Sequence, residues 1–151
     1  MSTHRSFTEP SPSPPARIAI RDDLLSTPLS DLSAVRLMGS RCSTCGETTL
    51  GTSTTCPNCG QNTVTALPLS KRGRVWTYTI VRHKPPGDYR GPDPFVPFAM
   101  GLVELPEGLR VLTPIDCELD RLKIDLEVEL RPYVRPGEVP EVVAFTFVPV
   151  A

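Results

Sequence analysis

The sequence predicts a mostly β protein in which a small cysteine-rich ribbon precedes a five-stranded barrel. Proline makes up 18 of the 151 residues, about 12% against a usual ~5%. It interrupts long helices and broad sheets because it lacks a backbone N–H. Two CxxC pairs stand together in the first half of the chain, and five short runs of β-branched and aromatic residues follow in the second half. The length suits one ordinary domain or two very small ones.

The charge balance argues against a dedicated nucleic-acid binder. The chain has 16 lysines and arginines against 17 acidic residues, for a net charge of −1, whereas such binders usually show a clear basic excess. The longest apolar stretch, residues 95–103, contains a proline and is far shorter than the ~20 residues of a membrane-spanning helix. The first twenty residues contain no apolar signal-peptide core, so we expect a cytoplasmic protein.

The two CxxC pairs predict a structural metal site. Ten residues separate the pairs, which consist of Cys42, Cys45, Cys56 and Cys59. Each CxxC turn can direct two sulfurs at one point, and two turns complete the tetrahedral four-sulfur site that zinc favours. A glycine follows each pair and allows the turn a positive φ. We therefore expect one structural Zn2+ per chain in a rubredoxin-like zinc ribbon, with no open coordination position for catalysis.

Two other uses of the cysteine pairs fit the sequence less well. Two disulfides would require an oxidising compartment, for which the sequence gives no signal. A redox CxxC normally stands alone and begins a helix in a βαβ unit.

The ribbon divides the chain into three parts. We expect a flexible N-terminal segment over residues 1–33, the zinc ribbon over residues 34–69 and the barrel over residues 70–151. Residues 1–15 are rich in serine and proline, which is typical of disorder. Residues 17–31 are weakly apolar and could form a short helix or lie extended against a partner.

The barrel is predicted from five strand-like runs. They cover residues 74–81, 98–105, 109–115, 126–134 and 141–148. In the first run, simple alternation places Trp76, Tyr78 and Ile80 on one face. Five short strands of this kind suit an OB-fold, because barrel closure removes most sheet edges.

No group of residues in the sequence is typical of an active site. The two histidines are His4, in the N-terminal segment, and His83, at a strand end, and no glycine-rich phosphate loop occurs. Pairs of carboxylates such as Glu127 and Glu129 fall on one strand face, where we expect them to be solvated. Cys117 stands alone and is expected to be a small buried hydrophobe. We predict no catalytic residue in this chain.

The order of these motifs resembles a known family. A CxxC…CxxC ribbon leads into RGRVWTYTIV, then a proline-rich loop, then PFAMGLVELPEGLRVLTPI and LEVELRPY. This layout, over residues 34–148, resembles the zinc-ribbon OB-fold proteins long described as a domain of unknown function and found beside acyl-CoA thiolases. The most specific parts are Gly73 with the strand residues 76–78, and residues 99–105 followed by Glu107 and Gly108.

The resemblance implies a non-catalytic small subunit of a thiolase-like enzyme. In that family the partner carries the catalytic residues, and the ribbon protein supports the complex and helps to shape the acyl-CoA site. The loop 83–89 and the missing long helix look closest to the small subunit of benzoylsuccinyl-CoA thiolase in anaerobic toluene breakdown. The chain departs from the family pattern in residues 17–38, which are short and carry no aromatic residue, and in Asp125, where glycine is usual.

A basic run supplies candidate contacts to the CoA thioester that the resemblance implies. Residues 71–84 contain five lysines and arginines and no acid. At the end of this run, Arg82, His83 and Lys84 could approach the CoA phosphates or an acidic surface of the partner. The alternative is an ordinary charged strand edge, which prevents edge-to-edge aggregation.

The loop of residues 85–97 supplies candidate partner contacts. It has five prolines in thirteen residues, which lowers the entropy that it would lose on binding. Tyr89, Arg90 and Phe95 belong to residue types enriched in binding hot spots. A rigid loop facing only solvent is the alternative.

Two other functions remain open at this stage. Zinc ribbons and OB-folds also occur in nucleic-acid-binding modules, and Trp76 and Tyr78 with nearby arginines could form a stacking surface. The chain could also be a structural protein of an unknown assembly.

Overall fold

The computed structural model describes residues 17–151, which form two β-sheets with short connections. The elements are β1 (Arg17–Ala19), the 3₁₀ helix η1 (Leu32–Ala34), β2 (Met38–Cys42), β3 (Thr48–Leu50), β4 (Val64–Pro68), β5 (Arg72–Val81), β6 (Phe98–Glu104), β7 (Arg110–Ile115), the 3₁₀ helix η2 (Leu119–Arg121), β8 (Glu127–Arg135) and β9 (Glu141–Pro149). The predicted mostly β fold is confirmed. No helix within residues 17–151 is long and apolar enough to cross a membrane.

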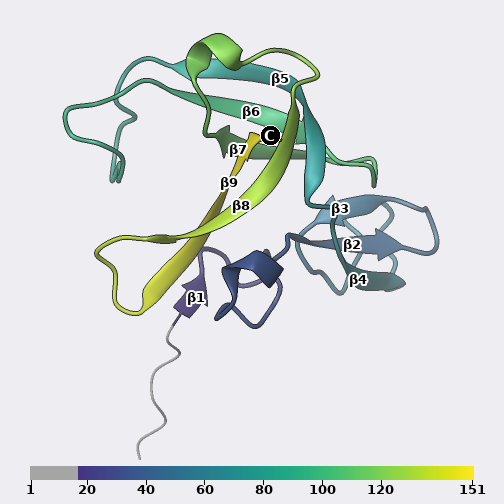
Figure 1. Ribbon diagram of the computed structural model, residues 1–151. Helices are drawn as coiled ribbons and strands as arrows, with labels where there is room; N and C mark the ends of the chain where they lie inside the picture. The colour runs from purple at the N-terminus through teal and green to yellow at the C-terminus, as the bar shows by residue number, and fades with distance from the viewer. Residues whose placement is uncertain (1–16) are drawn as a thin grey trace, which may run out of the picture.

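Strands β5 to β9 form the barrel (Figure 1). The sheet order is β1-β9-β7-β6-β5-β8, and antiparallel pairing between β8 and β9 closes the ring. Between β7 and β9 the contact is a single parallel pair, Ile115 with Phe147. The five strands begin and end within two residues of the predicted runs, because alternating apolar residues and turn residues mark both.

A β-bulge in β5 changes the expected faces of that strand. Val75 pairs with Val103, but Thr77 pairs with the next residue of β6, Leu102, so Trp76 is the extra residue. Beyond the bulge, Tyr78 lies opposite the buried Gly101. The expectation that Trp76 shares a face with Tyr78 is therefore wrong, because a bulge interrupts the alternation.

The close approach of β5 and β6 explains why glycine occupies position 73. A Cβ on Gly73 would lie 2.5 Å from the Glu104 carbonyl oxygen and 2.8 Å from Cγ1 of Val103. The barrel tolerates no side chain here, where β5 meets the end of β6.

The ribbon is a three-stranded antiparallel sheet in the order β3-β2-β4. It joins the barrel through one continuous hydrophobic core that includes Leu37 and Leu69, which are 1% and 0% exposed. At the junction, the Arg36 guanidinium donates to the Leu69 carbonyl over 2.9 Å. The Glu107 carboxylate accepts both the N–H and the hydroxyl of Ser70, each over 2.7 Å.

The N-terminal segment differs from the flexible stretch expected over residues 1–33. Residues 1–16 lie outside the described chain, and residues 17–33 pack on both sheets. Strand β1 pairs in parallel with residues 141–143 of β9, and Leu24 and Leu25 are buried in the shared core. The sequence signal was weak because two leucines among polar residues have no clear period, and their burial depends on contacts distant in sequence.

Candidate functional site

The four predicted cysteines come together at the end of the ribbon. Their sulfur atoms all lie within 4.8 Å of one another. The Sγ atoms of Cys42 and Cys59 are 3.6 Å apart, and those of Cys45 and Cys56 are 3.7 Å apart. Tetrahedral coordination with metal–sulfur bonds of about 2.3 Å separates the sulfurs by about 3.8 Å, whereas a disulfide bond is only about 2.05 Å long. The cluster therefore fits a metal ion of the zinc-ribbon type and excludes the two-disulfide interpretation of this geometry.

Two matching backbone turns hold the cysteines in place. The Gly46 N–H donates to the Cys42 carbonyl, and the Gly60 N–H donates to the Cys56 carbonyl, each over 2.9 Å. Gly46 and Gly60 have φ of 78° and 76°, which a residue with a side chain adopts at a cost. The repeated CxxCG pattern thus produces the same knuckle twice and directs two sulfurs from each knuckle to one centre.

The electrostatics of the cluster call for a cation. The Thr63 hydroxyl, followed by the backbone N–H of Cys45, lowers the pKa of Cys42 to about 6. At Cys59, a hydrogen bond from the Gln61 N–H lowers the pKa, but partial desolvation of the sulfur and the other cysteines outweigh it and raise the pKa to about 12. Four thiols this close cannot all ionise by themselves, because each new negative charge opposes the next. A bound divalent cation removes that conflict.

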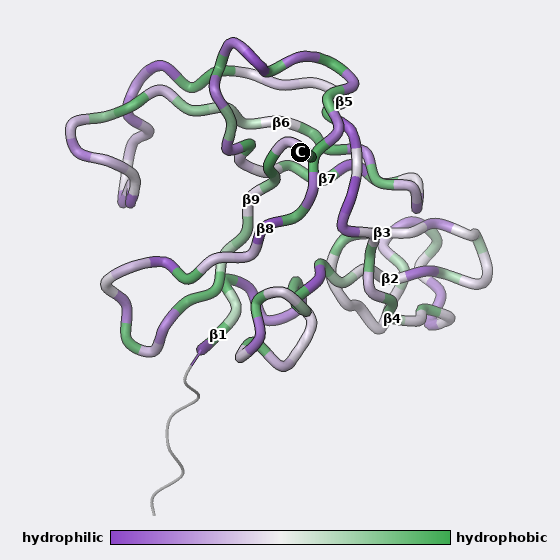
Figure 2. Tube along the Cα trace, in the orientation of Figure 1, coloured by the Kyte–Doolittle hydropathy of each residue, from purple (hydrophilic) through white to green (hydrophobic). Residues whose placement is uncertain are grey.

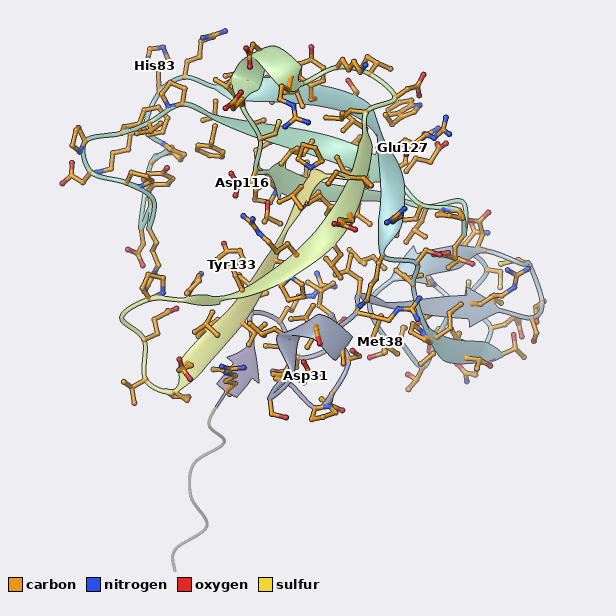
Figure 3. All side chains as sticks on the ribbon, in the orientation of Figure 1. Asp31, Met38, His83, Asp116, Glu127 and Tyr133 are labelled. Atoms are coloured by element: carbon orange, nitrogen blue, oxygen red, sulfur yellow. The ribbon has the colours of Figure 1, made fainter. Side chains whose placement is uncertain are left out.

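The second feature is a groove of about 850 Å³ beside the barrel. One wall comes from the proline-rich loop through Tyr89 and Arg90, and the other from β8 through Arg131 and Tyr133. Figure 3 shows Tyr133 and Asp116 near this space, between the loop and the β8–β9 hairpin.

An ion pair connects the two walls of the groove. Arg90 lies 2.9 Å from Glu138, which also pairs with Arg135 over 2.6 Å. Arg135, the nearest partner, and then Arg90 lower the pKa of Glu138. The loop and the β8–β9 turn are therefore held together although they are far apart in sequence.

The predicted contact residues separate into two groups. Tyr89 and Phe95 pack together with Phe98 in an aromatic cluster, with ring centroids 5.8–6.2 Å apart, and Arg90 lines the groove beside them. By contrast, residues 82–84 are exposed beyond the end of β5 and do not line the groove. In Figure 3, His83 lies at the outer edge of the molecule.

Two of the five cations in the basic run are already paired with carboxylates near its start. The beginning of β5 is hydrophilic in Figure 2, where Arg72 lies 3.7 Å from Glu129 and Arg74 lies 3.5 Å from Glu127. Among residues 17–151, Arg82 and Lys84 make no ion pair. Within β5 and the residues directly after it, the cations without a carboxylate partner thus lie beyond the end of the strand.

The environments of Cys117 and Trp76 differ in part from those that we expected from the sequence. Cys117 packs against the core but is only half-buried and lines the groove, and burial raises the pKa of its thiol. Trp76 is 46% exposed, and the Arg110 guanidinium lies 3.7 Å from its ring centroid. One face of this indole is therefore occupied, which weakens the nucleic-acid stacking surface considered from the sequence.

The groove residues contributed by β8 were missed by sequence reasoning. Arg131, Tyr133 and Arg135 alternate along one strand face, but a strand pattern alone does not show what covers that face. The available signal was the three-residue spacing of Arg135 and Glu138 around a Pro-Gly turn.

Comparison with known proteins places the chain in a family. The profile of the family described as "ChsH2, C-terminal OB-fold domain" matches residues 67–131. Benzoylsuccinyl-CoA thiolase subunit BbsA of Geobacter metallireducens is 34% identical over 109 residues, which cover 72% of this chain and 68% of BbsA. A DUF35 domain-containing scaffold protein of Pyrococcus furiosus is 35% identical over 63% of this chain and 67% of its own length. The chain belongs to the DUF35 family.

A solved structure agrees with this assignment of the DUF35 chain. The "Ltp2-ChsH2(DUF35) aldolase" structure matches 77% of this chain and 86% of the compared chain, with a TM-score of 0.60 and 25% sequence identity. The resemblance identified from the ribbon and strand motifs is confirmed.

Proposed function

We propose that this DUF35 protein is a non-catalytic zinc-binding subunit of a thiolase-type acyl-CoA enzyme complex. The observation that carries the proposal is its 34% identity with BbsA, of which the chain covers 68%. In this function the chain supports assembly and helps to shape the acyl-CoA site, and the partner carries the catalytic residues. The sequence motifs and the likeness to a ChsH2 structure support the same function.

Zinc is the metal that best suits the cysteine cluster. Four thiolates in tetrahedral geometry are typical of structural zinc sites. When the ion is bound, its four bonds to the cysteine sulfurs fix both knuckles. The ribbon has few buried apolar residues beyond its junction with the barrel, so these bonds provide folding free energy there.

The substrate that we propose is an aryl-substituted acyl-CoA thioester such as benzoylsuccinyl-CoA, cleaved by thiolysis during aromatic degradation. BbsA proteins of Geobacter metallireducens and Thauera aromatica both support this choice by name, at 34% and 30% identity.

Coexpression with a thiolase-type candidate partner tests the proposed function. We expect a stable complex by size-exclusion chromatography with light scattering. Consumption of benzoylsuccinyl-CoA with free CoA should require both proteins. Cleavage by the isolated chain would contradict a non-catalytic role, and a folded chain that forms no complex would contradict the subunit role.

The cations at the end of β5 are proposed to contact the CoA thioester or an acidic surface of the partner. Arg82 and Lys84 are exposed and without a carboxylate partner in the described chain, and His83 lies between them. We expect the double substitution Arg82→Ala and Lys84→Ala to raise KM for the thioester about tenfold, because each phosphate contact is a charge-assisted hydrogen bond. Steady-state kinetics of the assembled complex measure this effect.

A matched control separates this contact from a general loss of charge. Arg121 and Lys123 are also exposed and two residues apart, and the Arg121→Ala, Lys123→Ala variant removes the same two charges. If both double variants change KM equally, or neither does while assembly is intact, the proposed contact is wrong.

The proline-rich loop and its groove are proposed to contact the protein partner. The aromatic cluster of Tyr89, Phe95 and Phe98 gives the loop a defined shape, and Val96 beside it is 54% exposed. Its Arg90–Glu138 pair fixes the loop against the barrel. A preformed surface of this kind loses little entropy on binding.

A further inference from the structure

The hydrogen bonds around the cysteine cluster are unequally divided between its two knuckles. Thr63 Oγ1 lies 3.4 Å from Cys42 Sγ and 2.7 Å from the hydroxyl of Thr44. Asn58 Nδ2 donates to Cys45 Sγ over 3.6 Å. Both side-chain donors thus reach sulfurs of the first knuckle, although Asn58 belongs to the second.

The chemistry of a metal-bound thiolate determines the direction of the hydrogen bonds that connect Thr44, Thr63 and Cys42. Such a sulfur has no proton to donate, so the Thr63 hydroxyl must donate to Cys42. The Thr63 oxygen then accepts from the Thr44 hydroxyl. Thr63 is itself fixed, because its carbonyl accepts the N–H of Ser43 over 2.9 Å and the hydroxyl of Ser43 over 3.3 Å.

The second knuckle has no comparable side-chain donors within residues 17–151, although the Gln61 N–H donates to Cys59 as the Glu47 N–H donates to Cys45. Among the side-chain hydrogen bonds, none from a residue other than cysteine reaches Cys56 or Cys59. Cys56 is 3% exposed, but Cys59 is an exposed residue. Cys59 therefore combines access to solvent with the absence of a side-chain donor to its sulfur.

We infer that Thr63, Thr44 and Asn58 form an outer shell that protects the Cys42 and Cys45 thiolates, and that Cys59 is the site where small electrophiles first attack the metal centre. A hydrogen bond withdraws electron density from a thiolate and lowers its nucleophilicity, while exposure raises its rate of modification. Outer-shell partners also orient the ligands of a metal. The inference rests on the zinc site of the proposed function.

The chemical step is alkylation of a zinc-bound sulfur. With N-ethylmaleimide, the Cys59 sulfur forms a bond to one alkene carbon, and the alkene π pair takes a proton from water at the other. The neutral thioether that results is a weak ligand, so zinc is released.

Limited labelling of the full-length, zinc-loaded protein tests the inference. A Cys117→Ser background removes the free thiol that lines the groove. Zinc content is measured first. Peptide mass spectrometry after substoichiometric N-ethylmaleimide then identifies the first adduct, while a chromogenic chelator follows zinc release. We expect Cys59 to carry at least threefold more label than Cys42 or Cys45.

Substitutions of the outer-shell residues provide a second test of the inference. Thr63→Val should raise labelling of Cys42 several-fold, weaken zinc affinity about tenfold and shift the sulfur-to-metal charge-transfer band of the cobalt-substituted protein. Thr63→Ser should restore all three. Thr65→Val is the control, because Thr65 is exposed two residues beyond Thr63, in β4, and forms no hydrogen bond to a cysteine sulfur. If Thr63→Val fails to fold, Asn58→Ala should raise labelling of Cys45 instead.

The outcomes distinguish a failure of the outer shell from a failure of the zinc site. First labelling of Cys42 or Cys45 on a zinc-loaded chain, or equal behaviour of Thr63→Val and Thr65→Val, overturns the outer shell and leaves the zinc site intact. A folded wild-type chain that binds no zinc overturns both the zinc site and the inference.

Discussion

Asp125 holds a backbone conformation that usually belongs to glycine. Its φ is 67°, the one positive value at a residue other than glycine in the described chain. The conformation allows two backbone hydrogen bonds to form. The Asp125 N–H donates to the Val75 carbonyl over 2.8 Å, and the Val75 N–H donates to the Leu126 carbonyl over 3.0 Å. Aspartate tolerates the left-handed region better than most residues, but still at a cost.

We expect Asp125→Gly to raise the free energy of unfolding by about 0.5–1 kcal/mol, because glycine adopts this φ without steric strain. Asp125→Ala should lower it by a similar amount. Urea unfolding of the metal-loaded protein measures both changes. Asp120→Gly serves as control, since Asp120 lies in η2 without a positive φ and should lose stability with glycine. An Asp125→Gly variant less stable than wild type would contradict this account of the turn.

The turn between β6 and β7 connects the barrel to the ribbon. Glu107 in this turn receives two hydrogen bonds from Ser70, which links β4 to β5. Ser70 is half-buried and its backbone N–H has no other partner in the hydrogen bonds of this junction. A loop carboxylate therefore satisfies the backbone at the point where one sheet passes into the other.

Glu107→Gln should destabilise the protein by about 1–2 kcal/mol, because it replaces hydrogen bonds to a charged acceptor by weaker neutral ones. Glu104→Gln, in the same hairpin, removes the exposed pair with Arg110 and should cost about 0–1 kcal/mol. Thermal or urea unfolding compares them. Equal losses in the two variants would show that the contact with Ser70 has no special role.

Prediction from sequence succeeded for elements whose signal is local. The five barrel strands were predicted because each alternates and ends at a turn residue, and the cysteine cluster because CxxCG repeats. The bulge at Trp76 was not predictable, since an extra residue in β5 is defined only by its pairing with β6. The groove was missed for a similar reason: its walls meet through Arg90 and Glu138, which are distant in sequence.

Residues 17–151 share one hydrophobic core rather than two. Buried residues from the N-terminal segment, the ribbon base and the barrel form a single cluster that includes Leu25, Leu37, Leu69 and Phe147. Beyond this base, residues 43–63 are mostly exposed or half-buried, with Gly51 and Cys56 as the buried exceptions. We therefore expect a metal ion at the cysteine cluster to stabilise the distal ribbon, while the core stabilises the rest.

Removing the metal should unfold only part of the chain. With a strong chelator, we expect backbone amides of residues 42–63 to lose protection from hydrogen exchange, because bonds to the metal are their main support. Amides of β5 to β9 should keep theirs, since the barrel core remains. Cys59→Ser without chelator should reproduce the pattern, and Cys117→Ser should not. Loss of protection throughout the barrel would show that the two parts unfold together.

Strand β1 covers residues 141–143 at the outer edge of β9. Unpaired strand edges are templates for pairing with other chains. By covering this edge, the three residues of β1 protect the protein against aggregation. A shortened version of the protein that begins after Ala19 would expose this edge together with the apolar residues Val142 and Val143. Solubility at high concentration would then depend on a segment that contributes nothing to the metal centre or to the groove.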